Sequence, residues 1–273
     1  MDLDQALDQL AQDPTAALDV AELALLLARD EYPVLDVEAY LAELNAMAHE
    51  ARAYVRGDLE GRVAGLCRYL FHELGFHGNV DDYYDPRNSY FNEVLDRRTG
   101  IPITLSAVAI AVGARVGLEI QGVGLPGHFV VKAREGCQEV LFDPYHGGRH
   151  LTPACCELLV QQATGRPFEA SQANLSGILL AVLVQRLLNN LKIIYLRTKD
   201  FCRAARVIER LRQLDPDDAS LHRDLGACHF QTGQQGKAIN HFDAYLHDMP
   251  EADDAEAVRQ LLHQARQQLA QWN

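Results

Sequence analysis

The sequence lacks the surplus of positive charge that binding to nucleic acids requires. Its 273 residues include 25 lysines and arginines against 38 aspartates and glutamates, which gives a formal net charge of −13. No stripe of basic residues interrupts this acidity, and a surface of this sign repels phosphate backbones. We therefore expect no nucleic-acid partner.

Long apolar runs and closely spaced cysteine pairs are missing as well. The most apolar stretch, 177–196, is interrupted by polar and charged residues, so it is a poor candidate for a membrane span. The chain opens on Met1-Asp2-Leu3-Asp4, the reverse of a charged-then-apolar leader. None of the six cysteines forms a C-x-x-C motif, and the adjacent pair Cys155-Cys156 lacks the spacing of a zinc knuckle. We expect a cytoplasmic protein with reduced thiols, no membrane contact and no cofactor.

What the sequence does contain is a repeat near its C-terminus. When the tail is displaced against itself by 34 residues, similar residues coincide, as Ala204 does with Ala238. This is the spacing of tetratricopeptide repeats, in which small residues let paired helices approach closely. The pattern predicts repeats at about 185–218 and 219–252, with a capping helix at 255–272 because two repeats bury little alone. Such a tail either binds a partner protein or packs on the rest of its own chain, and we favour the partner.

The region before the repeats begins with helices. Apolar residues recur at three- and four-residue spacing over 16–28, 37–55 and 59–74. A polar loop rich in Asp, Tyr and Asn follows at 81–92, and loops of this kind often carry function. The next helix is expected over 103–116, with Pro102 in its first turn, where the missing N–H of proline does no harm.

Three strands are expected after this helix, at 119–124, 128–134 and 137–143. If Glu135-Gly136 is a two-residue hairpin turn, the numbers of paired residues sum to 271. Lys132 then faces Glu139, which is a favourable cross-strand pair of opposite charge.

The same register places His128 opposite Asp143. A carboxylate beside an imidazole orients the ring and stabilises its protonated form, which is the base-and-orienter half of a nucleophilic triad. On these two residues alone, a hydrogen bond that merely closes the end of the hairpin is the simpler interpretation.

Three longer segments resemble the bacterial SirB-one family. They are N-S-Y-F-N-E-V-L-D-R-R-T-G-I-P-I-T-L-S (88–106), G-V-G-L-P-G-H-F-V-V (122–131) and F-D-P-Y-H-G-G (142–148). Members of that family have a transglutaminase-like core followed by tetratricopeptide repeats. The resemblance implies an α+β fold of the papain and transglutaminase type over 1–170, with a helical N-terminal part and a small antiparallel sheet. An all-α domain of tetratricopeptide-type repeats would follow over 175–273.

The resemblance also assigns counterparts to the catalytic residues of the transglutaminase-like fold. His128 and Asp143 match the histidine that opens a strand and the aspartate on the next strand. Pro102 stands at the helix start, where the nucleophilic cysteine belongs, and no cysteine lies between Cys67 and Cys137. Because proline offers no thiol and removes one N–H, the family's thiol chemistry is expected to be absent.

These observations leave two hypotheses of function. The first is a non-catalytic transglutaminase-like protein that binds a protein or peptide through the repeat groove or the vestigial cleft. The second is a hydrolase of amidase or peptidase type, in which His128 and Asp143 activate Ser106, Thr104 or a water molecule.

Under the first hypothesis, a ligand would contact the polar loop at 81–92. No metal site is expected. The residues singled out for binding are Asn88, Tyr90 and Asn92. His146 and His150 have the i, i+4 spacing of helical metal ligands, but the two glycines between them favour a turn, which removes the shared face.

Overall fold

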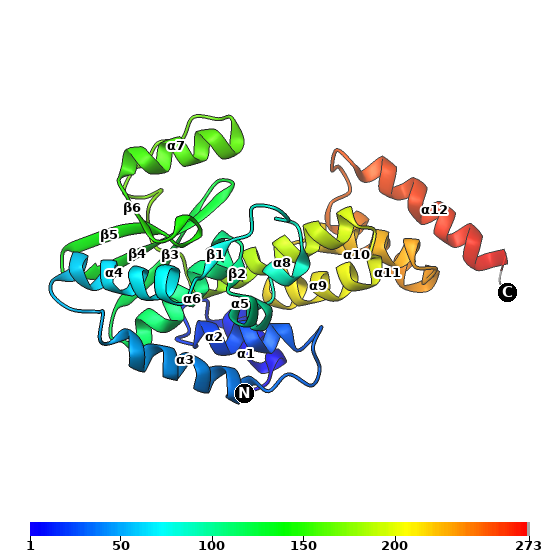
Figure 1. Ribbon diagram of the computed structural model, residues 1–273. Coiled ribbons are helices and arrows are strands. Elements are labelled where there is room, and N and C mark those ends of the chain that lie inside the picture. The colour runs from blue at the N-terminus through cyan, green and yellow to red at the C-terminus, as the bar shows by residue number, and fades with distance from the viewer. Residues whose placement is uncertain (272–273) are drawn as a thin grey trace. The chain divides into compact units, whose positions relative to one another are not determined.

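The computed structural model describes residues 1–271, so Trp272, the last residue of the predicted capping helix, lies outside the described residues. The chain divides into two compact units (Figure 1). The first comprises Met1–Ala6 and Pro14–Leu187, and the second comprises Leu7–Asp13 and the chain from Leu188 on. Among the described helices, none combines the length and apolarity needed to cross a membrane.

Helices make up the N-terminal part of the first unit. In chain order the helices up to the sheet are α1 (Leu3–Gln12, which the two units share), α2 (Val20–Ala28), α3 (Val37–Ala51), α4 (Leu59–Cys67), α5 (Phe91–Arg97) and α6 (Pro102–Arg115). Aspartates begin three of them: the carboxylates of Asp19, Asp36 and Asp58 each accept a hydrogen bond from a backbone N–H of the first turn. Helix α6 is buried over most of its length and lies against the sheet.

The sheet is antiparallel, with strand order β3-β4-β5-β6. Its strands are β3 (Glu119–Leu125), β4 (His128–Glu135), β5 (Gln138–Asp143) and β6 (Arg149–Leu151). A separate parallel pair joins β1 (His77–Gly78) to β2 (Thr99–Gly100), the latter just before α6. On one face of the larger sheet, Ile120 packs so closely on α6 that a Cβ at Gly113 would lie 2.3 Å from its side chain.

The predicted register of the β4–β5 hairpin is wrong by two residues. The turn is formed by Gly136 and Cys137, one residue later than predicted, and Lys132 pairs with Leu141. Gly136 has φ of 60°, which glycine adopts without strain in such turns. A slip of two residues keeps each side chain on its predicted face. For that reason Lys132 still forms an ion pair with Glu139, at 3.0 Å, as a diagonal neighbour.

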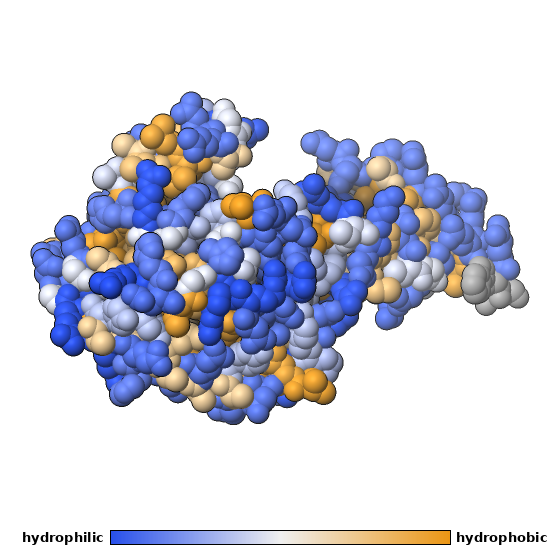
Figure 2. Space-filling model, viewed as in Figure 1, coloured by the Kyte–Doolittle hydropathy of each residue, from blue (hydrophilic) through white to orange (hydrophobic). Residues whose placement is uncertain are grey.

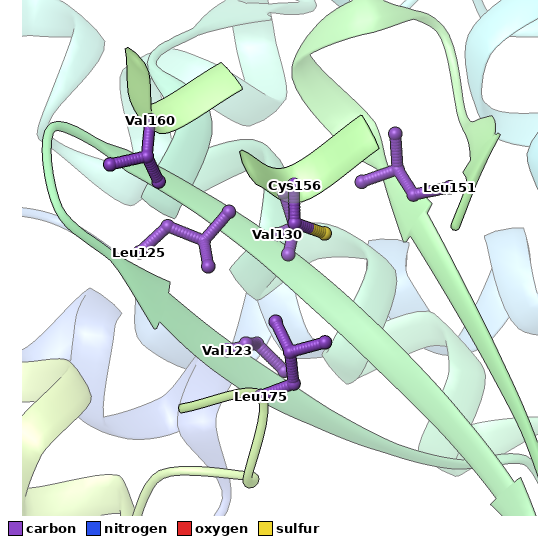
Figure 3. Packing of buried hydrophobic residues seen from close by; sticks show 7 residues of the cluster. All are labelled: Val123, Leu125, Val130, Leu151, Cys156, Val160 and Leu175. Atoms are coloured by element: carbon purple, nitrogen blue, oxygen red, sulfur yellow. The ribbon is translucent and has the colours of Figure 1, made fainter. Parts of the chain in front are cut away.

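The opposite face of the sheet is covered by α7 (Pro153–Thr164). Side chains from the helix and from the strands form one buried apolar cluster, which Figure 3 shows from close by. The members are Val123, Leu125, Val130, Leu151, Cys156, Val160 and Leu175. Helices on one side and α7 on the other therefore hold the sheet, and the strand ends that carry His128 and Asp143, in a fixed frame.

The tail consists of antiparallel helix pairs. Its elements are α8 (Leu180–Arg197, which begins in the first unit), α9 (Phe201–Leu214), α10 (Ser220–Gln231), α11 (Gln235–Asp248) and α12 (Ala255–Gln271). Close packing occurs where the repeat pattern places small residues: Ala204 and Ala238 are fully buried. A Cβ at Gly226 would lie 2.5 Å from the ring of Phe242, so α10 and α11 touch across a glycine.

Candidate functional site

The start of α6 is the position that the sequence resemblance predicts for a nucleophile, a prediction that the structure does not test. Pro102 occupies the first turn of this helix and is buried. The hydroxyl of Thr104 accepts a hydrogen bond from the backbone N–H of Ile101 at 3.0 Å and donates one to the carbonyl oxygen of Asn88 at 2.8 Å. Thr104 therefore caps its own helix and ties it to the preceding loop.

Ser106 lies one turn deeper in α6. Its side chain is fully buried, and its Oγ has no hydrogen-bond partner among residues 1–271. The hydrogen bonds of Thr104 and the lack of a partner for Ser106 both weigh against the hydrolase hypothesis. Neither hydroxyl is hydrogen-bonded to His128, so within the described chain neither has a base in contact.

A cluster of two histidines and one aspartate closes the β4–β5 end of the sheet. The predicted contact is present: His128 Nε2 lies 2.8 Å from Asp143 Oδ2. His146 joins it, with Nδ1 2.7 Å from the same oxygen. The other oxygen, Oδ1, accepts the backbone N–H groups of Tyr145 and His146. All the ring nitrogens and amides that face the carboxylate are thus donors to it.

The electrostatics of the cluster keep Asp143 ionised. Its side chain is only 1% exposed, and this burial alone would raise the pKa of the carboxyl. The hydrogen bonds and charges of His128 and His146 outweigh the burial and hold the pKa below its ordinary value. The sequence did not indicate His146 as a partner. The available signal was Asp143-Pro144, because an aspartate that caps a short turn brings the third residue after it back to its carboxylate.

Three tyrosines, which we call the aromatic ledge, extend from this cluster: Tyr145, Tyr83 and Tyr84. The ring centroid of Tyr145 is 6.1 Å from that of His128, and Tyr83 follows at 6.4 Å from Tyr145. Tyr84 lies edge-on to Tyr83 and is 50% exposed. Gly78 makes room for the ledge, since a Cβ there would lie 2.4 Å from the Tyr145 ring. The sequence indicated a functional loop here but did not identify these rings.

The residues predicted to bind a ligand are all buried. Asn88 is fully buried, and its Nδ2 donates to the carbonyl oxygen of Asp82 at 2.8 Å, so its amide organises the loop. Tyr90 stacks edge-on against Tyr32, and Asn92 is 4% exposed. A binding role for these three residues stays a prediction, and their burial does not favour it.

The thiols of the first unit differ sharply in their surroundings. Burial raises the pKa of Cys67 to about 12 and that of Cys156 to about 11. Cys155, in the first turn of α7, is the opposite case. The Thr152 hydroxyl donates a hydrogen bond to its sulfur at 3.3 Å, and this contact, with the charge of Arg149, lowers the pKa of the thiol. The sequence analysis did not identify Cys155 as a reactive thiol.

His128, Asp143 and His146, which we call the aspartate cluster, are also residue types that can bind a metal ion. One ligand atom each from His128, Asp143 and His146 lies within 4.8 Å of the others. However, both facing nitrogens already donate to Asp143, and a metal would have to displace those hydrogens. His150, the other histidine considered from the sequence, pairs with Phe142 through β6 and is exposed, outside this group.

Comparison with known proteins assigns both parts of the chain to families. Residues 38–189 match the transglutaminase-like superfamily, and residues 191–263 match the tetratricopeptide repeat. These matches confirm the predicted α+β fold with a helical C-terminal part. They do not carry the name SirB-one, so that finer name stays a prediction.

Similar proteins occur in several bacteria, and a shorter similarity extends to animals. A UPF0162 protein of Xylella fastidiosa strain Temecula1 is 35% identical over 266 residues, which cover 92% of each chain. A UPF0162 protein of Pseudomonas aeruginosa is 32% identical over 225 residues, or 81% of each chain. Human F-box only protein 21 is 32% identical over 124 residues, which are 42% of this chain and 20% of the human one.

Proposed function

Because the chain belongs to the UPF0162 family, with a transglutaminase-like region followed by tetratricopeptide repeats, we propose that it acts by binding another protein and not by catalysis. Pro102 at the start of α6 is the observation that carries this proposal. A helix N-terminus lowers the pKa of a thiol and supplies N–H groups for an oxyanion. Proline contributes neither the thiol nor its N–H.

The alternative, a hydrolase with a different nucleophile, is favoured by one observation. The 2.8 Å bond between His128 and Asp143 is the base-and-orienter arrangement that such an enzyme needs. Neither hydroxyl considered is paired with this base, since that of Thr104 caps its helix and that of Ser106 is buried with no hydrogen bond among the described residues. Only a water molecule would remain as a nucleophile.

Binding of a protein or peptide is supported by both parts of the chain. Tetratricopeptide repeats generally mediate contacts between proteins, and Ile193 of α8 is an exposed apolar side chain of the tail. In the first unit, the aromatic ledge extends from the vestigial His–Asp pair, and Val80 is an exposed apolar side chain. On the face seen in Figure 2, hydrophilic residues cover most of the surface and apolar ones form small separate areas. We assign the main contact to the tail.

The first experiment tests catalysis directly. Purified full chain, the His128→Ala variant and the Pro102→Cys variant are incubated with ester, peptide and glutamine-amide substrates. We expect no turnover above buffer for the first two, while Pro102→Cys gains a thiol that iodoacetamide modifies. Hydrolysis by the natural chain that disappears in His128→Ala would overturn the non-catalytic proposal.

The second experiment tests binding and its location. Proteins cross-linked to the chain in cells are identified by mass spectrometry, purified, and titrated against the full chain. Ile193→Asp should raise the Kd about tenfold, a cost of about 1.4 kcal/mol. Val34→Asp, which replaces a 97% exposed apolar residue of the first unit, is the matched control and should leave the Kd unchanged. Equal affinity for both variants would remove the assignment to the tail, and a loss confined to Tyr84→Ala would move it to the aromatic ledge.

A further inference from the structure

The tail contains a second histidine cluster, built from three helices. His222 and His229 lie two turns apart on α10, and His241 lies on α11. The rings of His229 and His241 are stacked, with centroids 5.4 Å apart and an interplanar angle of 17°. His222 contacts His241 from another side, with the two Nδ1 atoms 2.9 Å apart. Glu209 of α9 approaches the same place.

One nitrogen in this cluster is left without any partner. His229 is only 6% exposed, and its Nδ1 is buried with no hydrogen bond among the described residues. An unpaired buried ring nitrogen is costly, and such groups in native proteins usually have a ligand, an ion or a water to satisfy them. His229 therefore provides an observation, independent of the clustering itself, that a ligand belongs here.

One ligand atom from each of three side chains in this cluster lies close to the spacing that a metal site needs. One ring nitrogen of His229, one of His241 and one carboxylate oxygen of Glu209 lie within 4.8 Å of one another. Zinc holds such ligands tetrahedrally at about 2.1 Å, so two of them are about 3.4 Å apart. Side-chain movements of less than about 1 Å would close the site.

We propose that Glu209, His229 and His241 bind a divalent first-row transition metal, with zinc as the reference ion. Two imidazoles and one carboxylate form a three-ligand set that leaves a position for water. His222 would be the outer partner: its Nδ1 lies 2.9 Å from Nδ1 of His241, and in the tautomer with the hydrogen on His241 Nδ1 the Nε2 of His241 would be left for the metal.

Some of the charges around the site attract a cation and others repel it. Burial, with the charge of His222, lowers the pKa of His241 to about 4, and burial also lowers the pKa of His229. The carboxylate of Glu209 attracts a cation, although Arg212 is bonded to its Oε2. Arg212 and Lys237 oppose the metal charge. The aspartate cluster of the first unit is the weaker candidate, because its facing nitrogens already donate to a carboxylate.

Such a metal would join the two repeats. Glu209 belongs to the second helix of the first repeat, while His229 and His241 belong to the two helices of the next. Two repeats bury little surface, so an ion that binds only the folded tail would stabilise the contact between them.

The experiment uses the untagged full chain after chelator treatment and dialysis. Zn²⁺ is titrated by calorimetry, thermal unfolding is followed with and without Zn²⁺, and Co²⁺ serves as a spectroscopic probe of the ligand set. We expect one equivalent of Zn²⁺, a higher Tm, and a Co²⁺ spectrum without thiolate charge transfer. The absence of any Zn²⁺ binding would overturn the proposal.

Four variants locate the metal. His241→Ala and Glu209→Gln should weaken Zn²⁺ binding at least tenfold and remove the Tm shift. His247→Ala, on the same helix α11 but outside the cluster, is the matched control and should bind as the natural chain does. His146→Ala should also bind normally. Loss of binding in His146→Ala with retention in His241→Ala would assign the metal to the aspartate cluster and overturn the site proposed here. Circular dichroism verifies folding, and Glu209→Gln decides the matter if His241→Ala unfolds, because residue 209 is partly exposed.

Discussion

The two histidine clusters of this chain use the same residue type for opposite purposes. In the first unit, His128 and His146 surround the buried carboxylate of Asp143 and donate to it. In the tail, the rings of His222, His229 and His241 contact one another. Burial and the charge of His222 lower the pKa of His241 to about 4.

The difference shows that a central charge decides what a histidine cluster can do. A buried ionised carboxylate fixes its neighbouring rings as donors, so the aspartate cluster is a saturated, rigid arrangement. The tail cluster has no such carboxylate at its centre, and Nδ1 of His229 has no hydrogen-bond partner among the described residues, so this cluster is open to a ligand. The first cluster should therefore matter most for stability and the second for binding.

The largest effect is expected from removing that central charge. Asp143→Ala leaves two imidazoles and two backbone N–H groups of the turn without their acceptor. We expect a loss of about 3–5 kcal/mol in the free energy of unfolding, the range for breaking a buried charged pair. Urea unfolding measures it. Asp143→Asn, which keeps an acceptor for the backbone N–H groups, should lose less, and a variant as stable as the natural chain would show that the charge itself contributes nothing.

A smaller effect is expected where the tail depends on close apolar packing. Gly226→Ala would place a Cβ 2.5 Å from the ring of Phe242, which is fully buried and has no room to retreat. Overpacking of this kind costs about 1–3 kcal/mol, of which helix propensity returns up to about 1 kcal/mol. Gly236→Ala, on α11 with nothing within 4 Å, is the control and should not destabilise. If both variants unfold alike in urea, the contact between α10 and α11 is looser than the structure has it.

The sequence predicted the aspartate cluster better than it predicted the strands that carry it. Placing the turn one residue early shifted every pair of β4 and β5 by two, yet alternation with a period of two kept His128 and Asp143 on one face. Their contact survived a wrong register for that reason. His146 was missed because only helical spacing was considered, whereas a turn capped by Asp143 brings it back.

The tail cluster could not be predicted from sequence spacing. Glu209, His229 and His241 are separated by 20 and 12 residues and come from three different helices. Their meeting depends on how successive repeats pack, and the 34-residue pattern fixes the helices without fixing which side chains face one another. The burial of Asn88 and Asn92 escaped prediction for the same reason, since a polar loop folded on itself looks like an exposed one.

A fall in pH should destabilise the tail cluster before the aspartate cluster. We expect the change in the free energy of unfolding to be smaller than that of Asp143→Ala or Gly226→Ala. The pKa of His241 is about 4 in the folded chain against an ordinary value of 6.5, so the unfolded chain gains a proton first and the tail loses stability as the pH falls from 6.5 to 4. The pKa of Asp143 lies below 3.8, so its contribution is complete above 3.8 and is lost only below it. Water screens the partly exposed His241 ring, which limits the size of the effect.

Hydrogen exchange of the metal-free chain, corrected for intrinsic rates, measures this order of loss. Between pH 6.5 and 4, protection should fall in α10 and α11 while β4 and β5 keep theirs. His241→Gln, which cannot take up the proton, should flatten the response of the tail. Simultaneous loss of protection in both units would remove the distinction between the clusters.

The smallest effect is expected in the reactivity of the thiols. The comparison is between one accessible cysteine of the tail and two of the first unit. Cys137, Cys155 and Cys202 are all accessible, and the Thr152 hydroxyl and the charge of Arg149 lower the pKa of Cys155. Because the thiolate is the reacting form, iodoacetamide at pH 7 should modify Cys155 several times faster than the other two. Peptide mass spectrometry over a time course measures the three rates.

Thr152→Val tests the cause of this reactivity. The substitution removes the hydrogen bond to the Cys155 sulfur and keeps the shape of the side chain, so the rate at Cys155 should fall towards that of Cys137. An unchanged rate would assign the reactivity to Arg149 or to exposure alone. A slowed rate would mean that the first unit keeps an activated thiol at the start of α7 although Pro102 has removed the one at the start of α6.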